Sequence, residues 1–140
     1  MEIRAYMVAD KASCLGLMDS NMPENFTAEE REDFEAWLDA PQGLYWVAEH
    51  DGCVVGCGGM ALERADLASL TWLMVAGHLR GQGLGRFLLF YLMKNLPAGV
   101  THVRLATIPS VAGFFEKQGF HVQSTGAKGV EMIKKLQVCS

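Results

Sequence analysis

Short apolar runs alternate with amphipathic stretches along the chain, and this alternation is typical of an α/β protein. The order is strand, two helices, three strands, helix, strand, helix and two strands, with no repeat or linker between them. We therefore expect one α/β domain spanning residues 1–140. The pattern predicts strands at 1–6, 44–50, 53–62, 67–76, 102–107, 120–124 and 130–136, and helices at 9–22, 27–40, 84–96 and 110–118.

Three local signals mark where elements begin and end. Thr27 and Glu30 have the spacing of a capping box, in which each side chain bonds the other residue's amide at a helix start. Asp51-Gly52 favours the positive φ angles of a two-residue hairpin turn. Gly119 is well placed as a left-handed cap at a helix end.

Composition narrows the function classes. The net charge of −4 argues against nonspecific nucleic-acid binding, which needs a positive surface. No apolar run approaches the roughly 20 residues that span a bilayer, so we expect no membrane partner. Cys53 and Cys57 have no matching second pair, which disfavours zinc, and we predict that these two, Cys14 and Cys139 are reduced thiols of a cytoplasmic protein.

A glycine-rich turn lies between the predicted strand 67–76 and the predicted helix 84–96. Gly81, Gly83 and Gly85 carry no Cβ, so an anion can approach the main chain closely. The first amides of a helix have no internal partners and carry partial positive charge. With Arg80 and Arg86 on either side, this turn suits a pyrophosphate.

Two well-known phosphate-binding motifs do not fit this turn. A dinucleotide fingerprint starting at Gly81 or Gly83 fails, because its last glycine would fall on Arg86 or Leu88. A Walker loop also fails, because no Gly-Lys-Ser/Thr follows. A strand-to-helix turn that binds no ligand stays open as the alternative.

Two motifs in this order resemble the GNAT superfamily of N-acetyltransferases. Residues 80–85, Arg-Gly-Gln-Gly-Leu-Gly, match the family signature R/Q-x-x-G-x-G/A. Residues 114–120, Phe-Phe-Glu-Lys-Gln-Gly-Phe, are similar to its F-Y-E-K-x-G-F segment. From Leu44 onward the element order agrees with the family, whereas the first helices fit more loosely.

The resemblance implies a mixed, mostly antiparallel, splayed sheet flanked by about four helices. It also implies acetyl-coenzyme A as co-substrate, with transfer of the acetyl group to an amine of a small molecule or peptide by direct attack. The strands ending near Val75 and Thr107 would part to admit the pantetheine arm. The implied cofactor-binding residues are Leu73, Val75, Arg80, Gly81, Gln82, Gly83, Leu84, Gly85, Arg86 and Lys117. For Lys117 the alternative is a lysine that is exposed to solvent and contacts no ligand.

The chain departs from the family where a general acid is often found. Phe115 replaces the usual tyrosine and has no hydroxyl to protonate the leaving thiolate, and Ile108 replaces a frequent asparagine seven residues earlier. Either another group or water supplies the proton, or the domain is a coenzyme A-binding sensor or regulatory module with weak turnover. Direct attack without a dedicated acid is feasible, because it needs mainly position and a deprotonated amine.

Further candidates each have a structural alternative. Glu63 is the candidate base, against a solvated loop carboxylate. Ser110 is a candidate hydroxyl donor or a helix cap, and His78 an anion contact or a surface histidine. Tyr45 and Trp72 line an acceptor pocket or belong to the core, and an exposed final strand would support a homodimer.

Overall fold

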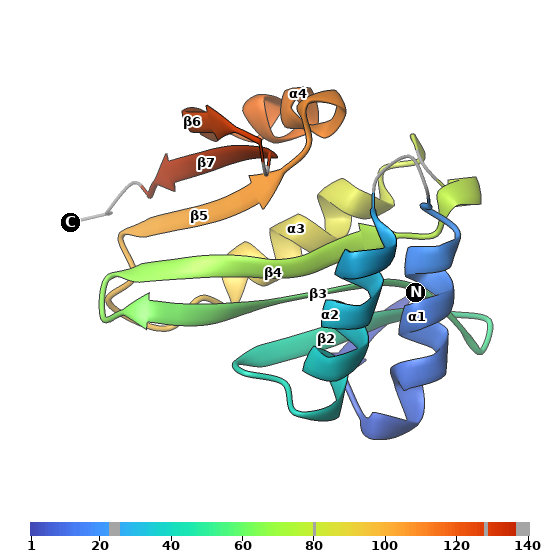
Figure 1. Ribbon diagram of the computed structural model, residues 1–140. Coiled ribbons are helices and arrows are strands. Elements are labelled where there is room, and N and C mark those ends of the chain that lie inside the picture. The colour runs from blue at the N-terminus through green and yellow to red at the C-terminus, as the bar shows by residue number, and fades with distance from the viewer. Residues whose placement is uncertain (23–25, 80, 128, 137–140) are drawn as a thin grey trace. The chain divides into compact units, whose positions relative to one another are not determined.

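The computed structural model describes residues 1–22, 26–79, 81–127 and 129–136 (Figure 1). The strands form a mixed seven-stranded sheet of order β1-β2-β3-β4-β5-β7-β6. The strands are β1 Glu2–Ala5, β2 Leu44–His50, β3 Cys53–Arg64, β4 Leu67–Val75, β5 His102–Thr107, β6 His121–Gly126 and β7 Gly129–Lys135. The described helices are α1 Lys11–Asp19, α2 Ala28–Asp39, α3 Leu84–Lys94 and α4 Pro109–Lys117, with 3-10 turns η1 Val8–Asp10 and η2 Gly77–Leu79.

The chain divides into two compact units, whose boundary crosses β3 and β4. Unit 1 comprises residues 1–60 and 71–95, and unit 2 comprises residues 61–70 and 96–140. The α/β class, the mixed sheet and the four helices predicted from the sequence are confirmed in the described residues. That residues 1–140 form one continuous domain stays a prediction.

Unit 1 packs helices on both faces of its strands. In Figure 1, α1 and α2 lie side by side over one face, while α3 lies on the other. The α1/α2 side buries Cys14, Met18, Phe34 and Leu38 against Tyr45, Val47, Cys57 and Met74 of the strands. The α3 side buries Leu84 against Ala48 and Val55. Because both faces are covered, β3 reads as an almost continuous buried run rather than an alternating one.

Unit 2 contains the parallel pair of the sheet and its C-terminal strands. β4 pairs in parallel with β5 through Leu67–Ser69 and His102–Arg104. β7 pairs antiparallel with both β5 and β6, and α4 packs over β6 and β7. The last strand in sequence is therefore internal, and β6 forms the edge. This corrects the expectation that the final strand is the exposed one.

The local signals are confirmed, whereas several element ends differ from prediction. Thr27 and Glu30 form the capping box, with reciprocal bonds of 3.1 and 3.0 Å. Asp51 and Gly52 have φ of 51° and 79°, and Gly119 has φ of 94°. The predicted helix 9–22 is replaced by η1 and a shorter α1, and beyond the end of α1 the Asn21 side chain donates to the Leu17 carbonyl at 2.8 Å.

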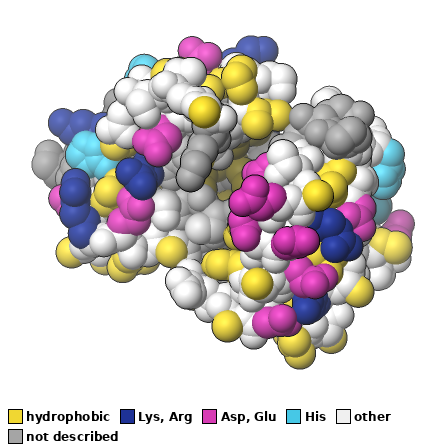
Figure 2. Space-filling model, in the orientation of Figure 1, with side chains coloured by type: hydrophobic (Ala, Val, Ile, Leu, Met, Phe, Trp, Pro, Cys, Tyr) yellow, Lys and Arg dark blue, Asp and Glu magenta, His cyan; other side chains and the backbone are white. Residues whose placement is uncertain are grey.

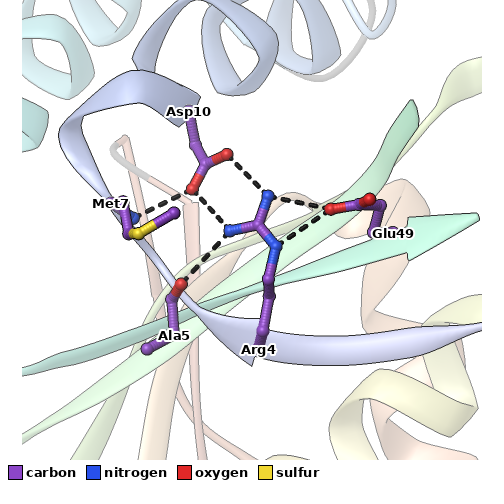
Figure 3. A network of polar contacts seen from close by, with 5 residues as sticks. All are labelled: Arg4, Ala5, Met7, Asp10 and Glu49. Carbon is purple, nitrogen blue, oxygen red and sulfur yellow. Dashed lines mark hydrogen bonds and ion pairs between the residues drawn. The ribbon is translucent and has the colours of Figure 1, made fainter. Parts of the chain in front are cut away.

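A charged network ties β1, β2 and the start of α1 together within unit 1 (Figure 3). The Arg4 guanidinium donates to both carboxylate oxygens of Asp10 at 2.8 and 2.9 Å, and to Glu49 at 2.9 Å. The amide of Met7 also donates to Asp10, at 2.9 Å. The hydrogen bond from Arg4 lowers the pKa of Asp10, which keeps this buried carboxylate ionised.

The surface of α2 is strongly acidic. Its sequence carries six carboxylates and Arg31 as its basic residue: the acids are Glu29, Glu30, Glu32, Asp33, Glu35 and Asp39. Arg31 bonds Asp19 of α1 at 2.6 Å. On the face shown in Figure 2, acidic side chains gather over α1 and α2.

Candidate cofactor site

The C-terminal end of β4 is fixed by the residues that follow α1. The buried side-chain amide of Asn21 donates to the Val75 carbonyl at 2.9 Å. The Ser20 hydroxyl accepts the Gly77 amide at 3.1 Å, and Ala76 donates to the Val55 carbonyl at 2.8 Å. The point where the chain leaves the sheet is therefore held from two sides, and no sequence signal marked Ser20 or Asn21 for this role.

Beyond this point the chain makes the predicted glycine turn. Gly81 and Gly83 have φ of 78° and 82°, in the left-handed region that glycine adopts without strain. A Cβ built at either position meets no atom within 4 Å, so the backbone borders open space. Gln82 is exposed between them. Arg80, also predicted to contact the cofactor, lies outside the described residues.

The helix that follows is anchored by its apolar face. Leu84, Leu88, Leu89 and Leu92 are buried, and the Phe87 amide donates to the Gly83 carbonyl at 3.0 Å to begin the helical pattern. Because Leu84 and Leu88 are held in the core, the first turn cannot shift without disturbing the packing of unit 1. The turn therefore presents its amides in a fixed direction.

The electrostatics of this helix start are unusual. Helices commonly begin with a Ser, Thr, Asp or Asn cap and carry acidic residues in the first turn. Here Gly83 is the cap, it supplies no side-chain bond, and the first turn of α3 contains the exposed Arg86 and no acidic residue. Within the described part of this turn, the protein supplies no negative group to the helix N-terminus, and this arrangement favours an external anion.

The two strand residues predicted to contact the pantetheine arm lie on β4 just before this turn. Leu73 and Val75 point to the α3 side: the Leu73 side chain lies over Gly58, and that of Val75 lies beside Gly56. The Val75 carbonyl, one of the backbone groups predicted to pair with the pantetheine arm, already accepts a hydrogen bond from the Asn21 side chain.

The middle of β4 has an irregularity that no sequence signal marked. Trp72 has φ of 45°, and its carbonyl accepts the Tyr45 hydroxyl at 2.6 Å. The Trp72 and Phe34 rings lie 5.0 Å apart, and Tyr45 is buried against Trp37 with 4.8 Å between ring centroids. The core interpretation of Tyr45 is thus confirmed.

The remaining candidates belong to unit 2, apart from His78, which is exposed in η2. Glu63 lies inside β3, not in a loop, and bonds Arg104 of β5 at 2.9 Å. Lys117 is exposed in the last turn of α4. Ser110 is inside the helix, so it is not the cap; Ile108 is. Phe115 is buried between Phe114 and Phe120, with centroids 5.1 and 5.8 Å away.

The part of the chain that the structure describes contains no cluster of potential metal ligands and no helix suited to spanning a membrane. Across residues 1–22, 26–79, 81–127 and 129–136, no three His, Cys, Asp or Glu side chains come together as metal ligands. Cys14, Cys53 and Cys57 are free thiols, and Cys139 lies outside the described residues. Of the helices described, none combines the length and the apolar character that crossing a bilayer requires.

The chain matches a known protein family over most of its length. The acetyltransferase (GNAT) family model matches residues 12–120. An uncharacterized N-acetyltransferase of Chlorobaculum tepidum is 34% identical over 77 residues, which cover 54% of this chain and 48% of the relative. The chain therefore spans about half the length of this curated relative.

Solved structures are similar over almost the whole chain. PaiA N-acetyltransferase from Thermoplasma acidophilum, in complex with coenzyme A, superimposes with a TM-score of 0.75 at 18% identity, covering 96% of this chain and 98% of that one. An aminoglycoside 6'-N-acetyltransferase complexed with coenzyme A gives 0.80 at 18% identity, covering 100% and 99%. The seven-stranded mixed sheet with its flanking helices is therefore similar to the fold of these N-acetyltransferases. The chain belongs to the acetyltransferase (GNAT) family.

Proposed function

We propose that the protein is an N-acyltransferase that moves acetyl from acetyl-coenzyme A to an amine of a small molecule or peptide. The observation that carries this proposal is the turn at Gly81–Gly83, whose glycines border open space directly before the buried helix α3. Family membership supports the same co-substrate, since relatives of this fold have been solved in complex with coenzyme A.

In this proposal the pyrophosphate binds the amides of Gly81, Gln82, Gly83, Leu84 and Gly85. Left-handed glycines let the phosphate oxygens reach the main chain, and the helix dipole adds partial positive charge. Arg86 adds full charge in the first turn of α3, and Arg80, which comes before the turn in the sequence, remains a further predicted contact. Leu73 and Val75 pair their backbone groups with the pantetheine arm as an added strand would, and Lys117 remains a further predicted phosphate contact.

The proposed chemistry is direct attack of a neutral amine on the thioester carbonyl. The new C–N bond forms as the C–S bond breaks, the amine loses a proton, and the thiolate leaves and is protonated. Glu63, which forms the ion pair with Arg104, remains the proposed base. Backbone amides of β4 are the proposed donors to the developing oxyanion.

Steady-state turnover tests the proposal. The full chain is supplied with acetyl-coenzyme A and a panel of small amines and peptides, and release of free thiol is followed. We expect saturable, amine-dependent thiol release. Absence of a calorimetric binding signal with acetyl-coenzyme A would contradict both the co-substrate and the reaction.

A second candidate is favoured by one observation, the buried Phe115 at the position of the usual tyrosine. Its ring packs between two other phenylalanines and offers no proton. In this alternative the protein is a coenzyme A-binding sensor or regulatory module. Tight binding with no turnover across the amine panel would favour it. A homodimer and a cytoplasmic location stay predictions, which sedimentation and fractionation would test.

A further inference from the structure

Trp72 adopts a backbone conformation that its side chain does not favour. Among the described residues, Asp51 and Trp72 are the non-glycine residues with positive φ, and Asp51 belongs to a hairpin turn. Trp72, in contrast, lies inside β4 with φ of 45°. A left-handed residue interrupts the extended geometry of a strand, as it does in a β-bulge of the type where glycine is usual, and we call this position of β4 the bulge. Such strain persists only where the surroundings impose it, and it concentrates at functional sites.

The Tyr45 hydroxyl is the group that engages this residue. It donates to the Trp72 carbonyl at 2.6 Å, while the Cys57 thiol approaches the same oxygen at 3.9 Å. Tyr45 is 6% exposed, and burial raises the pKa of its hydroxyl well above the ordinary value. The hydroxyl therefore stays protonated and acts as a donor at any physiological pH.

A glycine in β3 allows the Tyr45 side chain to reach Trp72 across that strand. Tyr45 is on β2 and Trp72 on β4, with β3 between them in the sheet. The residue opposite Tyr45 on β3 is Gly59, where a Cβ would come within 2.5 Å of the Tyr45 ring. Because Gly59 has no side chain, the ring can cross β3. Trp37 and Tyr6 then hold the ring, at 4.8 and 5.7 Å between centroids.

The bond also sets the direction of a neighbouring amide. The peptide that joins Trp72 to Leu73 is planar, and in the trans form its C=O and N–H point in opposite directions. Holding the Trp72 oxygen on the Tyr45 side therefore holds the Leu73 N–H on the other side. An oxyanion donor must be fixed before reaction, since its value depends on preorganised geometry.

We propose that Tyr45 is a positioning residue for acyl transfer: through the Trp72 carbonyl it orients the Leu73 amide toward the reacting thioester carbonyl. This inference rests on the proposed transferase function. Tyr45 does not touch the substrate in this mechanism. Its hydroxyl holds the Trp72–Leu73 peptide in one orientation. Without this bond, the peptide and its Leu73 N–H could rotate.

The test compares Tyr45→Phe with Tyr6→Phe in the full chain. Tyr45 and Tyr6 belong to the same aromatic cluster, and each variant removes one hydroxyl that donates to a backbone carbonyl. The Tyr6 hydroxyl donates to the Leu38 carbonyl at 3.3 Å. We expect Tyr45→Phe to lower kcat by about tenfold with KM for acetyl-coenzyme A changed less than about twofold, because complete loss of an oxyanion donor costs about 100- to 1000-fold. Tyr6→Phe should keep both constants within about twofold of the wild type.

A second readout does not depend on turnover. Amide hydrogen exchange over residues 71–75 should accelerate in Tyr45→Phe and stay unchanged in Tyr6→Phe, because the bulge loses the bond that holds it. An active wild type whose Tyr45→Phe variant keeps its kcat, or loses no more than Tyr6→Phe, would overturn the positioning role alone. A wild type without turnover would instead overturn the proposed function.

Discussion

Among the places in unit 1 where the backbone enters the left-handed region, the turn before α3 and the middle of β4 do so with opposite kinds of residue. At the turn before α3 the residues are Gly81 and Gly83, exposed and bordering open space. In the middle of β4 the residue is Trp72, packed 5.0 Å from the Phe34 ring and bonded through its carbonyl to Tyr45. The turn adopts its conformation at no steric cost, whereas the bulge is held by its neighbours.

The difference separates two uses of unusual backbone. The glycine turn leaves space free, as a site for a large anion requires. At the bulge the Trp72 carbonyl is instead bonded by the Tyr45 hydroxyl, which holds the direction of one peptide. Substitutions at the turn should therefore affect binding first, while substitutions around the bulge should affect stability and turnover.

The largest effect is expected from Gly83→Glu. A side chain at φ of 82° is strained, it occupies the open space before α3, and its carboxylate repels a phosphate. We predict a loss of affinity for acetyl-coenzyme A of at least about a thousandfold, or about 4 kcal/mol, measured by calorimetry.

The control is Gly16→Glu, which adds the same charge in the same unit. Gly16 is exposed on α1, and a Cβ there meets no atom within 4 Å. Its affinity for the cofactor should match the wild type. If a folded Gly83→Glu variant bound acetyl-coenzyme A as tightly as the wild type, the pyrophosphate would not bind at this turn.

The next effect is expected from Gly59→Ala beneath the Tyr45 ring. The new Cβ would collide with the Leu44 carbonyl and lie 2.5 Å from Cδ1 of Tyr45. Overpacking against backbone should lower the free energy of unfolding by about 2–3 kcal/mol, read from urea denaturation.

Gly56→Ala is the matched substitution on the same strand. Its nearest neighbours, in Leu88 and Met74, lie 3.4 Å from the Cβ position, so the loss should stay below about 1 kcal/mol. If Gly59→Ala proved as mild as Gly56→Ala, the Tyr45 ring would not need the gap in β3.

Gly81→Ala should have a smaller effect on stability. With φ of 78° and no atom within 4 Å, the substitution adds strain but no collision, for a loss of about 1–2 kcal/mol. Gly16→Ala, at an ordinary helical position, should instead gain up to about 1 kcal/mol. Thermal unfolding of both variants measures the difference, and a stabilised Gly81→Ala would show that the turn is not held in its left-handed form.

The glycine turn was predictable because its signal is local. The spacing of Gly81, Gly83 and Gly85 before an apolar helical pattern marks a turn and a helix start, and residues 84–94 form that helix. The capping box at Thr27 and the hairpin at Asp51-Gly52 were predictable for the same reason, since each depends on residues within a few positions.

The bulge could not be predicted, because it results from contacts between distant segments. Tyr45 and Trp72 are 27 positions apart, and Asn21 and Val75 are 54 apart. A tryptophan in a strand pattern gives no sign of positive φ, since its neighbours impose that conformation. Glu63 shows the same limit, because its strand position and its Arg104 partner follow from the pairing of the sheet.

The smallest expected effect is a dependence of the free energy of unfolding on alkaline pH. It tests whether the Tyr45 hydroxyl beside the bulge is shielded from solvent. Burial raises the pKa of Tyr6 to about 12 and that of Tyr45 well above its usual value, whereas an unfolded tyrosine titrates near about 10. Above about pH 10 the unfolded chain releases these protons while the folded protein keeps them. Their contribution to stability is therefore complete below that pH and falls as pH rises.

Tyr45→Phe removes this dependence at one site. The difference in unfolding free energy between wild type and Tyr45→Phe should shrink by about 1 kcal/mol between about pH 9 and about pH 11, since the slope is at most about 1.4 kcal/mol per pH unit. Urea denaturation at a series of pH values measures it, with Tyr6→Phe as the comparison. If this difference in unfolding free energy stayed constant with pH, the Tyr45 hydroxyl would be as exposed to solvent as the glycine turn. The bulge would then not differ from the turn by being buried.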